Sequence, residues 1–420
     1  MSTRQDCLVL DAQDPLAPLR EQFTLPAGKI YLDGNSLGVM PSSAPARVAQ
    51  VVTQEWGRDL IESWNSAGWI DLPQRIGDKI ARLVGADAGE LVVADSTSVN
   101  LFKVLSAALT IAKTAAPNRR VILSERGNFP TDLYIAQALA QERGFELLLT
   151  ETPAQIDTHL AAGKVAVMML TQVDYKSGLL HDMAALTRRA HEHGALAIWD
   201  LAHSAGALPV ALEASDADFA VGCGYKYLNG GPGAPAFVWV HPRHANRFEQ
   251  PLSGWMGHAA PFEFTPAYRP AAGIARYLCG TPALLSMAAL ECGVDSVLMA
   301  EPLGGMAALR AKSLALTDLF IALVEQRCSG HGLSVITPRE HALRGSQVAL
   351  AREEGAYAIV QALIARGVVG DFRAPDVLRF GFTPLYIRFI DVWDAAEHLL
   401  QVLSSGEWRE ARFNRKAAVT

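Results

Sequence analysis

The feature that most constrains the fold of this chain is a regular alternation of short apolar runs with helical patterns between residues 78 and 240. Each helical stretch is long enough to carry the chain from one strand to the next parallel strand. The predicted strands are Leu91–Ala94, Val121–Ser124, Phe145–Thr150, Val165–Leu170, Ala195–Asp200, Phe219–Cys223 and Ala236–Val240. The predicted helices between them are Ser98–Lys113, Thr131–Arg143, Pro153–Ala161 and Met183–His193. This order predicts an α/β fold with a mostly parallel, doubly wound sheet.

The pattern changes after about residue 300, where a second region begins. A long predicted helix is followed by strand-like runs and two further helices, namely Met306–Cys328, Ser334–Thr337, Gln347–Ala351, Ala356–Ala365 and Asp391–Leu403. A chain of 420 residues exceeds what one hydrophobic core usually organises. We therefore predict an N-terminal arm over 1–77, a large domain over 78–300 and a smaller α+β domain over 301–420, against which the arm packs.

Composition limits the partners and the compartment of the protein. A net charge of −6 argues against a nucleic-acid surface, and no apolar run approaches the length of a membrane helix. The N-terminus lacks the basic start and apolar block of a secretory signal. The five cysteines form an odd number without a CxxC pair, which is typical of buried thiols in a reducing compartment. We expect a cytoplasmic protein that binds neither nucleic acid nor membrane, and we expect no metal site.

A first candidate site follows the first predicted strand. Ligands of an open α/β sheet bind beyond the carboxyl ends of its strands. The segment Asp95–Asn100 lies there at a helix start and holds the hydroxyls of Ser96, Thr97 and Ser98. The unpaired N–H groups and the positive end of the helix dipole favour an anion, so these residues suit a phosphate group. Simple N-capping is the alternative interpretation of the same residues.

Two further residues follow later strands in the same way. Asp200 ends an apolar strand, where a carboxylate requires a cation or a donor, such as a protonated ring nitrogen; a helix cap is the alternative. Lys226 alone among nine lysines combines a strand end, flanking aromatics and a following glycine-rich turn. A lysine desolvated in such a place can act as an imine-forming nucleophile. A Walker-type loop is excluded, because Lys226 precedes the glycines instead of following them.

The order of these three features along the chain is more specific than any one of them. Hydroxyls at a helix start, an aspartate at a strand end and a lysine after a later strand are the requirements of a pyridoxal phosphate site. They supply the phosphate cradle, the carboxylate for the pyridine nitrogen and the lysine that forms an imine with the cofactor. The sequence therefore predicts pyridoxal phosphate as the cofactor.

Several longer stretches carry a family resemblance. They are Tyr31–Gly38, Asn128–Asp132, Trp199–Ser204, Gly224–Gly230, Leu252–Trp255, Arg276–Thr281 and Arg379–Tyr386. On these stretches the chain resembles fold-type I pyridoxal phosphate enzymes of the aminotransferase class V group, and within that group it is similar to the kynureninase family. The resemblance spans nearly the whole chain. Generic members of the group share the aspartate, histidine and lysine pattern but not these flanks.

The resemblance implies cofactor-binding roles residue by residue. Lys226 would form the imine, and Asp200 would pair with the pyridine nitrogen. Tyr225 would contact the phosphate and take part in proton transfer, so these three are the implied catalytic residues. The other implied cofactor contacts within the chain are Thr97, Ser98, Phe129, Asp132, Thr171 and His203.

The resemblance also implies how the substrate and a second subunit are placed. Arg379 would bind the substrate carboxylate, for which a planar bidentate guanidinium is suited. Ser36 and Trp64 would line the substrate side. Trp255 and Thr281 would reach the cofactor of the neighbouring subunit, which implies a homodimer with active sites at the subunit interface.

The implied reaction is hydrolytic cleavage of the Cβ–Cγ bond of L-kynurenine, and of its 3-hydroxy derivative, to the anthranilate and L-alanine in tryptophan catabolism. Three other interpretations stay open. A cysteine desulfurase or selenocysteine lyase would need an exposed reactive cysteine, for which Cys328 at a predicted helix end is the candidate. A class V aminotransferase is the second. A non-catalytic scaffold is the third, and the intact flanks of Lys226 and Asp200 disfavour it.

Overall fold

A seven-stranded sheet, called here the central sheet, organises residues 91–240. In the computed structural model, which describes residues 3–248 and 250–415, its strands are β2 (Leu91–Ala94), β3 (Val121–Glu125), β4 (Glu146–Thr150), β5 (Val165–Thr171), β6 (Leu196–Asp200), β7 (Phe219–Gly222) and β8 (Ala236–Val240). Their order across the sheet is β2-β8-β7-β6-β5-β3-β4. Strand β8 runs antiparallel to β2 and β7, and the other neighbouring pairs are parallel. The predicted α/β fold with a mostly parallel sheet is confirmed.

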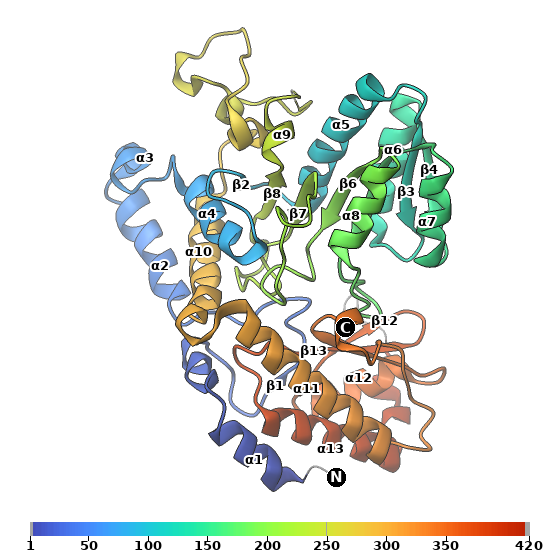
Figure 1. The fold of residues 1–420 in the computed structure, drawn as a ribbon. Coiled ribbons are helices and arrows are strands. Elements are labelled where there is room, and N and C mark those ends of the chain that lie inside the picture. The colour runs from blue at the N-terminus through green and yellow to red at the C-terminus, as the bar shows by residue number, and fades with distance from the viewer. Residues whose placement is uncertain (1–2, 249, 416–420) are drawn as a thin grey trace.

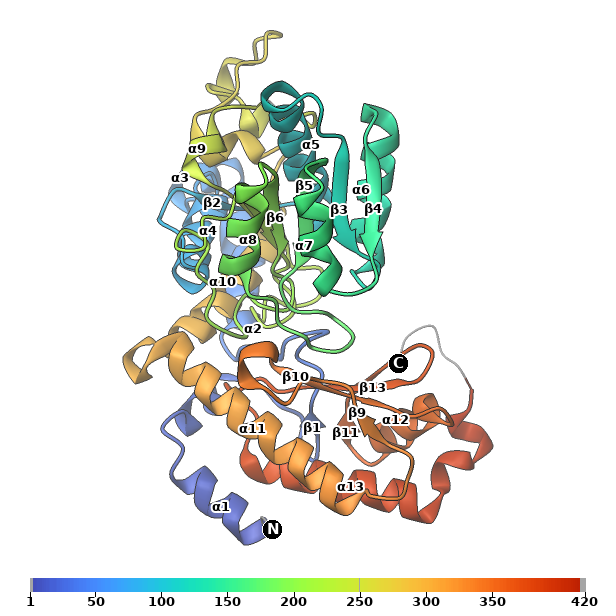
Figure 2. The same ribbon diagram turned by 45° about the vertical axis from the view of Figure 1, so that its right-hand side comes forward.

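Helices cover both faces of the central sheet (Figure 2). The connecting helices are α5 (Thr97–Ala115), α6 (Pro130–Arg143), α7 (Ala154–Ala161) and α8 (Met183–Glu192). Successive residues of one strand point to opposite faces, so Ile198 of β6 packs in the layer with α5 and α6, whereas Trp199 packs in the layer with α7 and α8. This double burial explains why the strands read as continuous apolar runs. No helix among the described residues is long and apolar enough to span a membrane.

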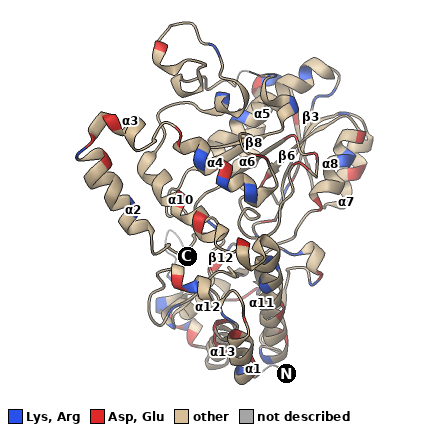
Figure 3. Ribbon diagram, turned by 60° about the vertical axis from the view of Figure 1, so that its left-hand side comes forward, with Lys and Arg blue, Asp and Glu red and all other residues tan. Residues whose placement is uncertain are grey.

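A second, four-stranded sheet, called here the C-terminal sheet, lies below the central sheet in Figures 1 and 2. It is antiparallel, with the order β12 (Asp371–Arg373), β13 (Val377–Gly381), β10 (Gln347–Ala351) and β9 (Ser334–Val335). Its helices are α11 (Gly305–Arg327), α12 (Ala356–Ala365) and α13 (Phe389–Ser405). Acidic and basic residues are interspersed over the helices and loops around both sheets (Figure 3).

The N-terminal arm contacts the last elements of the chain. Helix α1 (Arg4–Ala12) lies beside α13, where Arg4 pairs with Asp394 at 2.8 Å (Figure 1). Strand β1 (Ile30–Tyr31) pairs in parallel with β11 (Val368–Val369). The remaining helices of four or more α-helical residues are α2 (Ala44–Gln50), α3 (Ser63–Ser66), α4 (Leu72–Val84), α9 (Pro242–Ala245) and α10 (Leu284–Leu298). Helices α2 and α4 both pack on α10.

The carboxyl edge of the central sheet faces the C-terminal sheet. The loops after β5 and β6 accept hydrogen bonds from residues that flank its strands: Thr337 Oγ1, after β9, donates to the backbone oxygen of Ser177 at 2.6 Å, and Ser346 Oγ, before β10, donates to that of Ala207 at 3.0 Å. Polar residues at these strand ends are thus enclosed between two sheets and shielded from water. This is the edge at which the sequence places its candidate site.

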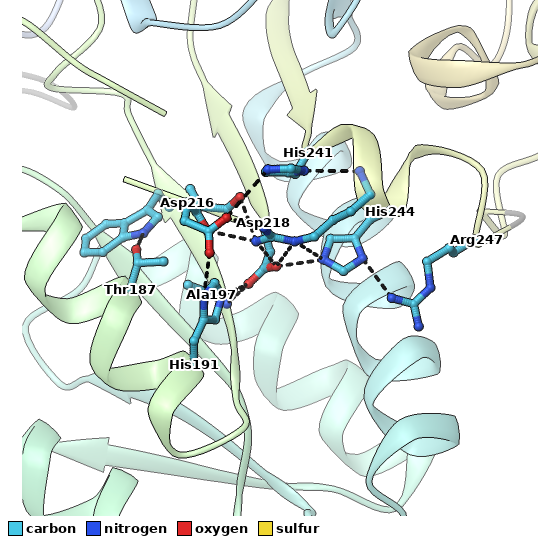
Figure 4. Close-up of polar contacts among 11 residues, drawn as sticks. Thr187, His191, Ala197, Asp216, Asp218, His241, His244 and Arg247 are labelled. Atoms are coloured by element: carbon cyan, nitrogen blue, oxygen red, sulfur yellow. Dashed lines mark hydrogen bonds and ion pairs between the residues drawn. The ribbon is translucent and has the colours of Figure 1, made fainter. Parts of the chain in front are cut away.

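The amino edge of the central sheet is held by a buried charge cluster (Figure 4). Asp218, directly before β7, is 1% exposed and accepts hydrogen bonds from His191 Nε2 at 2.8 Å, His244 Nε2 at 2.7 Å and Arg243 Nη2 at 2.6 Å. The backbone N–H of Ala197 also donates to it, at 2.8 Å. Because one carboxylate joins β6, β7 and the segment after β8, the cluster ties these elements together on the side away from the candidate site.

Candidate active site

One cavity lies at the carboxyl edge of the central sheet. Its lining residues are Thr97, Ser98, Phe129, Thr131, Asp132, Thr171, Tyr175, Asp200, Ala202, His203, Tyr225 and Lys226. The structure therefore brings together every residue that the sequence predicts as a cofactor contact from the same chain. They come from the last residues of β5 and β6 and from the loops and helix starts that follow β2, β3, β5, β6 and β7.

The start of helix α5 forms one end of this cavity. Thr97 and Ser98 are its first two residues. Asp95, just before the helix, has a left-handed φ of 46°, which turns the chain sharply out of β2. Its carboxylate pairs with Lys103, a fully buried lysine whose Nζ also donates to the backbone oxygen of Tyr277 at 2.6 Å. Lys103 thus fixes the turn that presents the helix N-terminus and its hydroxyls to the cavity.

Lys226 is held by contacts of its side chain and of its backbone. Its Nζ lies 3.0 Å from His203 Nε2, and His203 Nδ1 lies 3.1 Å from Gln347 Oε1. On the backbone side, the N–H of Gly38 donates to the oxygen of Tyr225 at 2.8 Å. A Cβ atom at Gly38 would lie 2.4 Å from the oxygen of Lys226, so only glycine permits this approach. The N-terminal arm therefore packs directly against the lysine loop.

Asp132 and Asp200 form a buried carboxyl pair on the other side of the cavity. Asp200 ends β6 and accepts a hydrogen bond from the N–H of Ala202 at 2.7 Å. Burial, and then the charge of Asp200, raise the pKa of Asp132 well above its ordinary value. Two carboxyls this close hold a proton between them unless a cation joins them. The pair is thus a site for a protonated nitrogen.

Phe129 provides an open aromatic wall. Its ring is 43% exposed and meets Tyr175 edge to face, with ring centroids 5.3 Å apart. The preceding residue, Asn128, accepts hydrogen bonds from the N–H of Phe129 at 2.7 Å and from the hydroxyl of Thr171 at 2.5 Å. An aromatic ring that lines a cavity while its neighbours are hydrogen-bonded in place offers a fixed flat surface.

Arg379 and Ser36 lie together beside the cavity. The Nη1 of Arg379 donates to the backbone oxygen of Tyr175 at 2.5 Å, and its Nη2 donates to Ser36 Oγ at 2.9 Å. Nε and Nη2 also bind both oxygens of Asp371, with Nε at 2.8 Å. Arg373 binds the same carboxylate at 2.7 Å. Two guanidinium groups thus share one carboxylate next to the cavity.

Three other predicted site residues, unlike Ser36 and Arg379, lie away from this cavity in the same chain. Trp64 and Trp255 meet edge to face at 6.1 Å and line an apolar hollow with Ile61, Phe262 and Phe264. Thr281 lines a separate hollow that also contains Asp95 and Gly280. Within one chain these three side chains do not meet Lys226.

The sequence-based prediction missed several residues around the site. They are Asn128, Tyr175, Gln347, Asp371 and Arg373. The sequence did contain a signal for Gln347, because it is a polar residue at the start of an apolar, buried strand. A buried amide needs hydrogen-bond partners, so such a residue indicates polar groups nearby.

Comparison with known proteins identifies the family. The kynureninase of Pseudomonas fluorescens is 57% identical over 422 residues, covering 100% of both chains, and that of Burkholderia pseudomallei is 57% identical with the same coverage. A family model described as the kynureninase C-terminal domain matches residues 309–399. The chain belongs to the kynureninase family. The predicted resemblance is confirmed.

Solved structures share the fold of this kynureninase-family chain at low sequence identity. The cysteine desulfurase of Thermococcus onnurineus superimposes with a TM-score of 0.77 at 17% identity, over 92% of this chain and 98% of that one. A cysteine desulfurase of Escherichia coli gives 0.75 at 18%, over 93% and 98%. The protein C-DES, with glycine covalently linked to its pyridoxal phosphate, gives 0.77 at 17%, over 92% and 98%. The fold is that of fold-type I pyridoxal phosphate enzymes.

The cavity of this kynureninase-family chain fits pyridoxal phosphate on its own chemistry. Asp132 Oδ2 is buried and has no hydrogen-bond partner among the described residues, so the carboxyl pair has capacity for a ring N–H. The start of α5 supplies N–H groups and hydroxyls for a phosphate. Phe129 supplies a flat surface for an aromatic ring, and Lys226 supplies a primary amine.

Proposed function

We propose that the chain uses pyridoxal phosphate to hydrolyse the Cβ–Cγ bond of L-kynurenine, giving anthranilate and L-alanine. Membership of the kynureninase family supplies the reaction. The observation that carries the assignment to a site is the convergence of Lys226, His203 and the Asp132–Asp200 pair on one cavity beside Arg379. The 3-hydroxy derivative is the second substrate that we propose for the same site.

Each part of the cavity has a proposed task in holding the cofactor. Thr97 and Ser98 hold the phosphate, Asp200 pairs with the ring nitrogen, and Lys226 attaches covalently through Nζ. Bound there, pyridoxal phosphate supplies an electron sink for charge that develops at the substrate's Cα. Because Asp200 is buried, its interaction with a protonated nitrogen is little screened by water, which keeps that nitrogen charged.

The proton transfers belong to groups of this chain. We assign removal of the Cα proton to Lys226 Nζ, which lies next to the acceptor His203 Nε2. Burial raises the pKa of Tyr225, so its hydroxyl stays protonated at neutral pH and can donate a proton to the product. Lys226 and Tyr225 are adjacent in the sequence and line the same cavity.

Substrate orientation is assigned to the group around Arg379. We propose that Arg379 binds the substrate carboxylate, with Ser36 beside it, and that in the proposed dimer Trp64, which lies beside Trp255, contacts the aromatic part of the substrate. In the observed arrangement the carboxylate of Asp371 accepts hydrogen bonds from two nitrogen atoms of the Arg379 guanidinium, Nε and Nη2. The substrate carboxylate therefore competes with a resident carboxylate for this arginine.

A cysteine desulfurase is disfavoured by the cysteine that it would need. Cys328 is 3% exposed at the end of α11, and burial raises its pKa to about 11. A thiol with that pKa is protonated near neutral pH, whereas the attacking species is the thiolate.

The protein's assembly and location are also proposals. We propose a cytoplasmic homodimer in which Trp255 and Thr281 of each chain complete the partner's cavity. Their position outside the cavity of their own chain supports this arrangement. The exposed aromatic side chains Phe262 and Phe264, at 58% and 77%, support a covering partner there.

One experiment tests the proposed function. Purified protein is incubated with pyridoxal phosphate and L-kynurenine, and the fluorescence of anthranilate and the release of alanine are followed without added keto acid. Both products are expected in equal amounts. Alanine that forms only when a keto-acid acceptor is added would instead indicate an aminotransferase.

The Lys226→Ala variant tests the site itself. It is expected to lose the visible imine absorbance and all turnover, because no other lysine lines the cavity among the described residues. Lys113→Ala, at an exposed position near the end of α5, is the matched control and should behave as wild type. Absorbance that persists in Lys226→Ala and is still bleached by borohydride would assign the imine to another lysine.

A further inference from the structure

Gln347 is a fully buried amide at the site that none of the proposed steps uses. It is the first residue of β10 and so belongs to the C-terminal sheet. Its side chain reaches across to the central sheet, where Oε1 lies 3.1 Å from His203 Nδ1. Nε2 of the same amide lies 3.0 Å from the backbone oxygen of Tyr175 and 3.3 Å from that of Asp174.

These contacts determine which way the amide points. The backbone oxygens of Asp174 and Tyr175 can only accept hydrogen bonds, so the NH₂ group of Gln347 must face them. The amide oxygen is left to face His203. A flipped amide would put an oxygen against two carbonyl oxygens and lose both hydrogen bonds.

The direction of the amide then determines the tautomer of His203. Because Oε1 of Gln347 is only an acceptor, Nδ1 of His203 must carry the hydrogen between them. In the neutral ring Nε2 then has a free lone pair. That lone pair faces Lys226 Nζ at 3.0 Å and accepts its hydrogen bond.

We propose that Gln347 is a positioning residue, which holds His203 in the neutral Nδ1–H tautomer and so presents Nε2 to the lysine side of the cavity as an acceptor. The proposal rests on the proposed function only in taking Lys226 as the lysine that binds the cofactor. It adds that a residue of the C-terminal sheet determines the hydrogen-bonding state of a group in the cavity of the central sheet.

The charges around His203 agree with a neutral ring. Burial, then the nearby charges of Lys226, Arg379 and Arg373, lower its pKa well below the ordinary value, and the hydrogen bond with Gln347 opposes this shift only in part. The Asp132–Asp200 pair lines the same cavity. A neutral amide at position 347 adds no counter-charge for an imidazolium. A carboxylate at the same place would add one directly at Nδ1–H.

The test replaces the amide by a carboxylate of the same size. Cofactor-loaded Gln347→Glu is titrated between about pH 5 and 8, where imidazoles ordinarily change charge, and its visible absorbance is recorded without kynurenine. One ionisation step more than in wild type is expected. The step should vanish in the double variant Gln347→Glu, His203→Gln, because it belongs to His203. Since no kynurenine is present, this result is independent of whether kynurenine is the substrate.

Two further variants separate positioning from a structural role. Gln347→Met keeps the side-chain volume and removes the hydrogen bonds, and it should show no added step. Gln172→Glu places the same carboxylate at another buried glutamine, directly after Thr171, that is not hydrogen-bonded to His203 among the described residues. It should also show none. An added step in either control, or its absence from Gln347→Glu, would overturn the proposal.

A measurement on the unaltered protein decides the matter if Gln347→Glu does not fold. Nitrogen-15 labelling of histidine distinguishes protonated from bare ring nitrogens by their chemical shifts. One histidine with Nδ1–H and bare Nε2 throughout about pH 6–9 is expected to disappear in His203→Gln. An Nε2–H tautomer at this residue would contradict the role assigned to Gln347.

Discussion

Arg379 illustrates how a single residue is prepared for a ligand by its neighbours. Its guanidinium is almost fully buried and is oriented by Asp371, Ser36 and the backbone oxygen of Tyr175. Burial of Asp33, and then the charge of Asp371, raise the pKa of Asp33 to about 7, so this neighbouring carboxyl is partly neutral at physiological pH. Two guanidiniums then face one full carboxylate charge, and the excess positive charge favours an incoming anion.

The variant Arg379→Lys is expected to raise the KM for L-kynurenine by about 10-fold to 100-fold, with a smaller change in kcat. Lysine keeps the charge but loses the planar fork that binds a carboxylate on two atoms. Steady-state kinetics measure the effect. Arg366→Lys is the control, because Arg366 makes a similar two-atom contact with Glu407 away from the cavity. An unchanged KM in Arg379→Lys would remove this residue from the carboxylate site.

The residues that local patterns alone could predict are those that follow strands of the central sheet, whereas Arg379 and Ser36 were predicted from the family resemblance. Lys226, Asp200 and Thr97 each come directly after an apolar run, so the sequence places them at one edge. Gln347 and Asp371 belong to the C-terminal sheet instead. The position of Gln347 at the start of a buried apolar strand was a local signal that this residue is unusual. The approach of both residues to the cavity depends on how the two sheets pack, and no local pattern in the sequence records that packing.

At the scale of elements, the buried cluster around Asp218 makes a measurable contribution to stability. Burial alone would raise the pKa of Asp218, but hydrogen bonds from His191, His244 and the Ala197 N–H outweigh it and lower the pKa well below 3.8. Asp218→Asn should reduce the free energy of unfolding by about 3–5 kcal/mol, because it removes the buried carboxylate that Arg243 and two histidines share as their hydrogen-bond acceptor. Urea denaturation at neutral pH measures this difference.

The pH dependence of that difference has a definite sign. A carboxyl whose folded-state pKa lies below its unfolded value stabilises the fold above the unfolded pKa and loses this contribution as pH falls through the folded pKa. The gap between wild type and Asp218→Asn should therefore be full at pH 5–7, which is above 3.8, and shrink below it. Asp216→Asn is the control. Its side chain is 58% exposed, so it should cost about 0–1 kcal/mol. Equal losses in the two variants would contradict the account.

Elements of the central sheet were predictable because its strands, apart from the edge strand β4, are buried on both faces. The predicted helix Thr131–Arg143, for example, differs from the observed α6 by one residue. The N-terminal helices α1 and α2 were not predicted, since they are short and depend on packing against α13 and α10. The division into 1–77, 78–300 and 301–420 stays a prediction.

At the scale of the whole molecule, a shared active site can be tested by mixing two impaired chains. Lys226→Ala and Trp255→Ala, each strongly impaired alone, are co-expressed with different tags. If Trp255 completes the partner's cavity, hybrid dimers contain one intact site, and about a quarter of wild-type activity should return on random pairing. If Trp255 serves its own chain, every hybrid site carries a change and no activity returns. Sedimentation analysis of the same samples establishes whether dimers form.

The contacts between the N-terminal arm and the last elements of the chain also bear on how the protein is made. Arg4 and Asp394 are 390 residues apart. Strand β1 cannot form its parallel pairing until β11 has been synthesised. At about 5–20 residues per second, synthesis separates the two ends by roughly 20–80 seconds. The central sheet is complete in sequence only after β8, about 150 residues before Asp394 is made. From that point Gly38 can pack against the lysine loop, whereas the C-terminal sheet is still being made. The arm can therefore dock onto the lysine loop before it docks onto the C-terminal sheet.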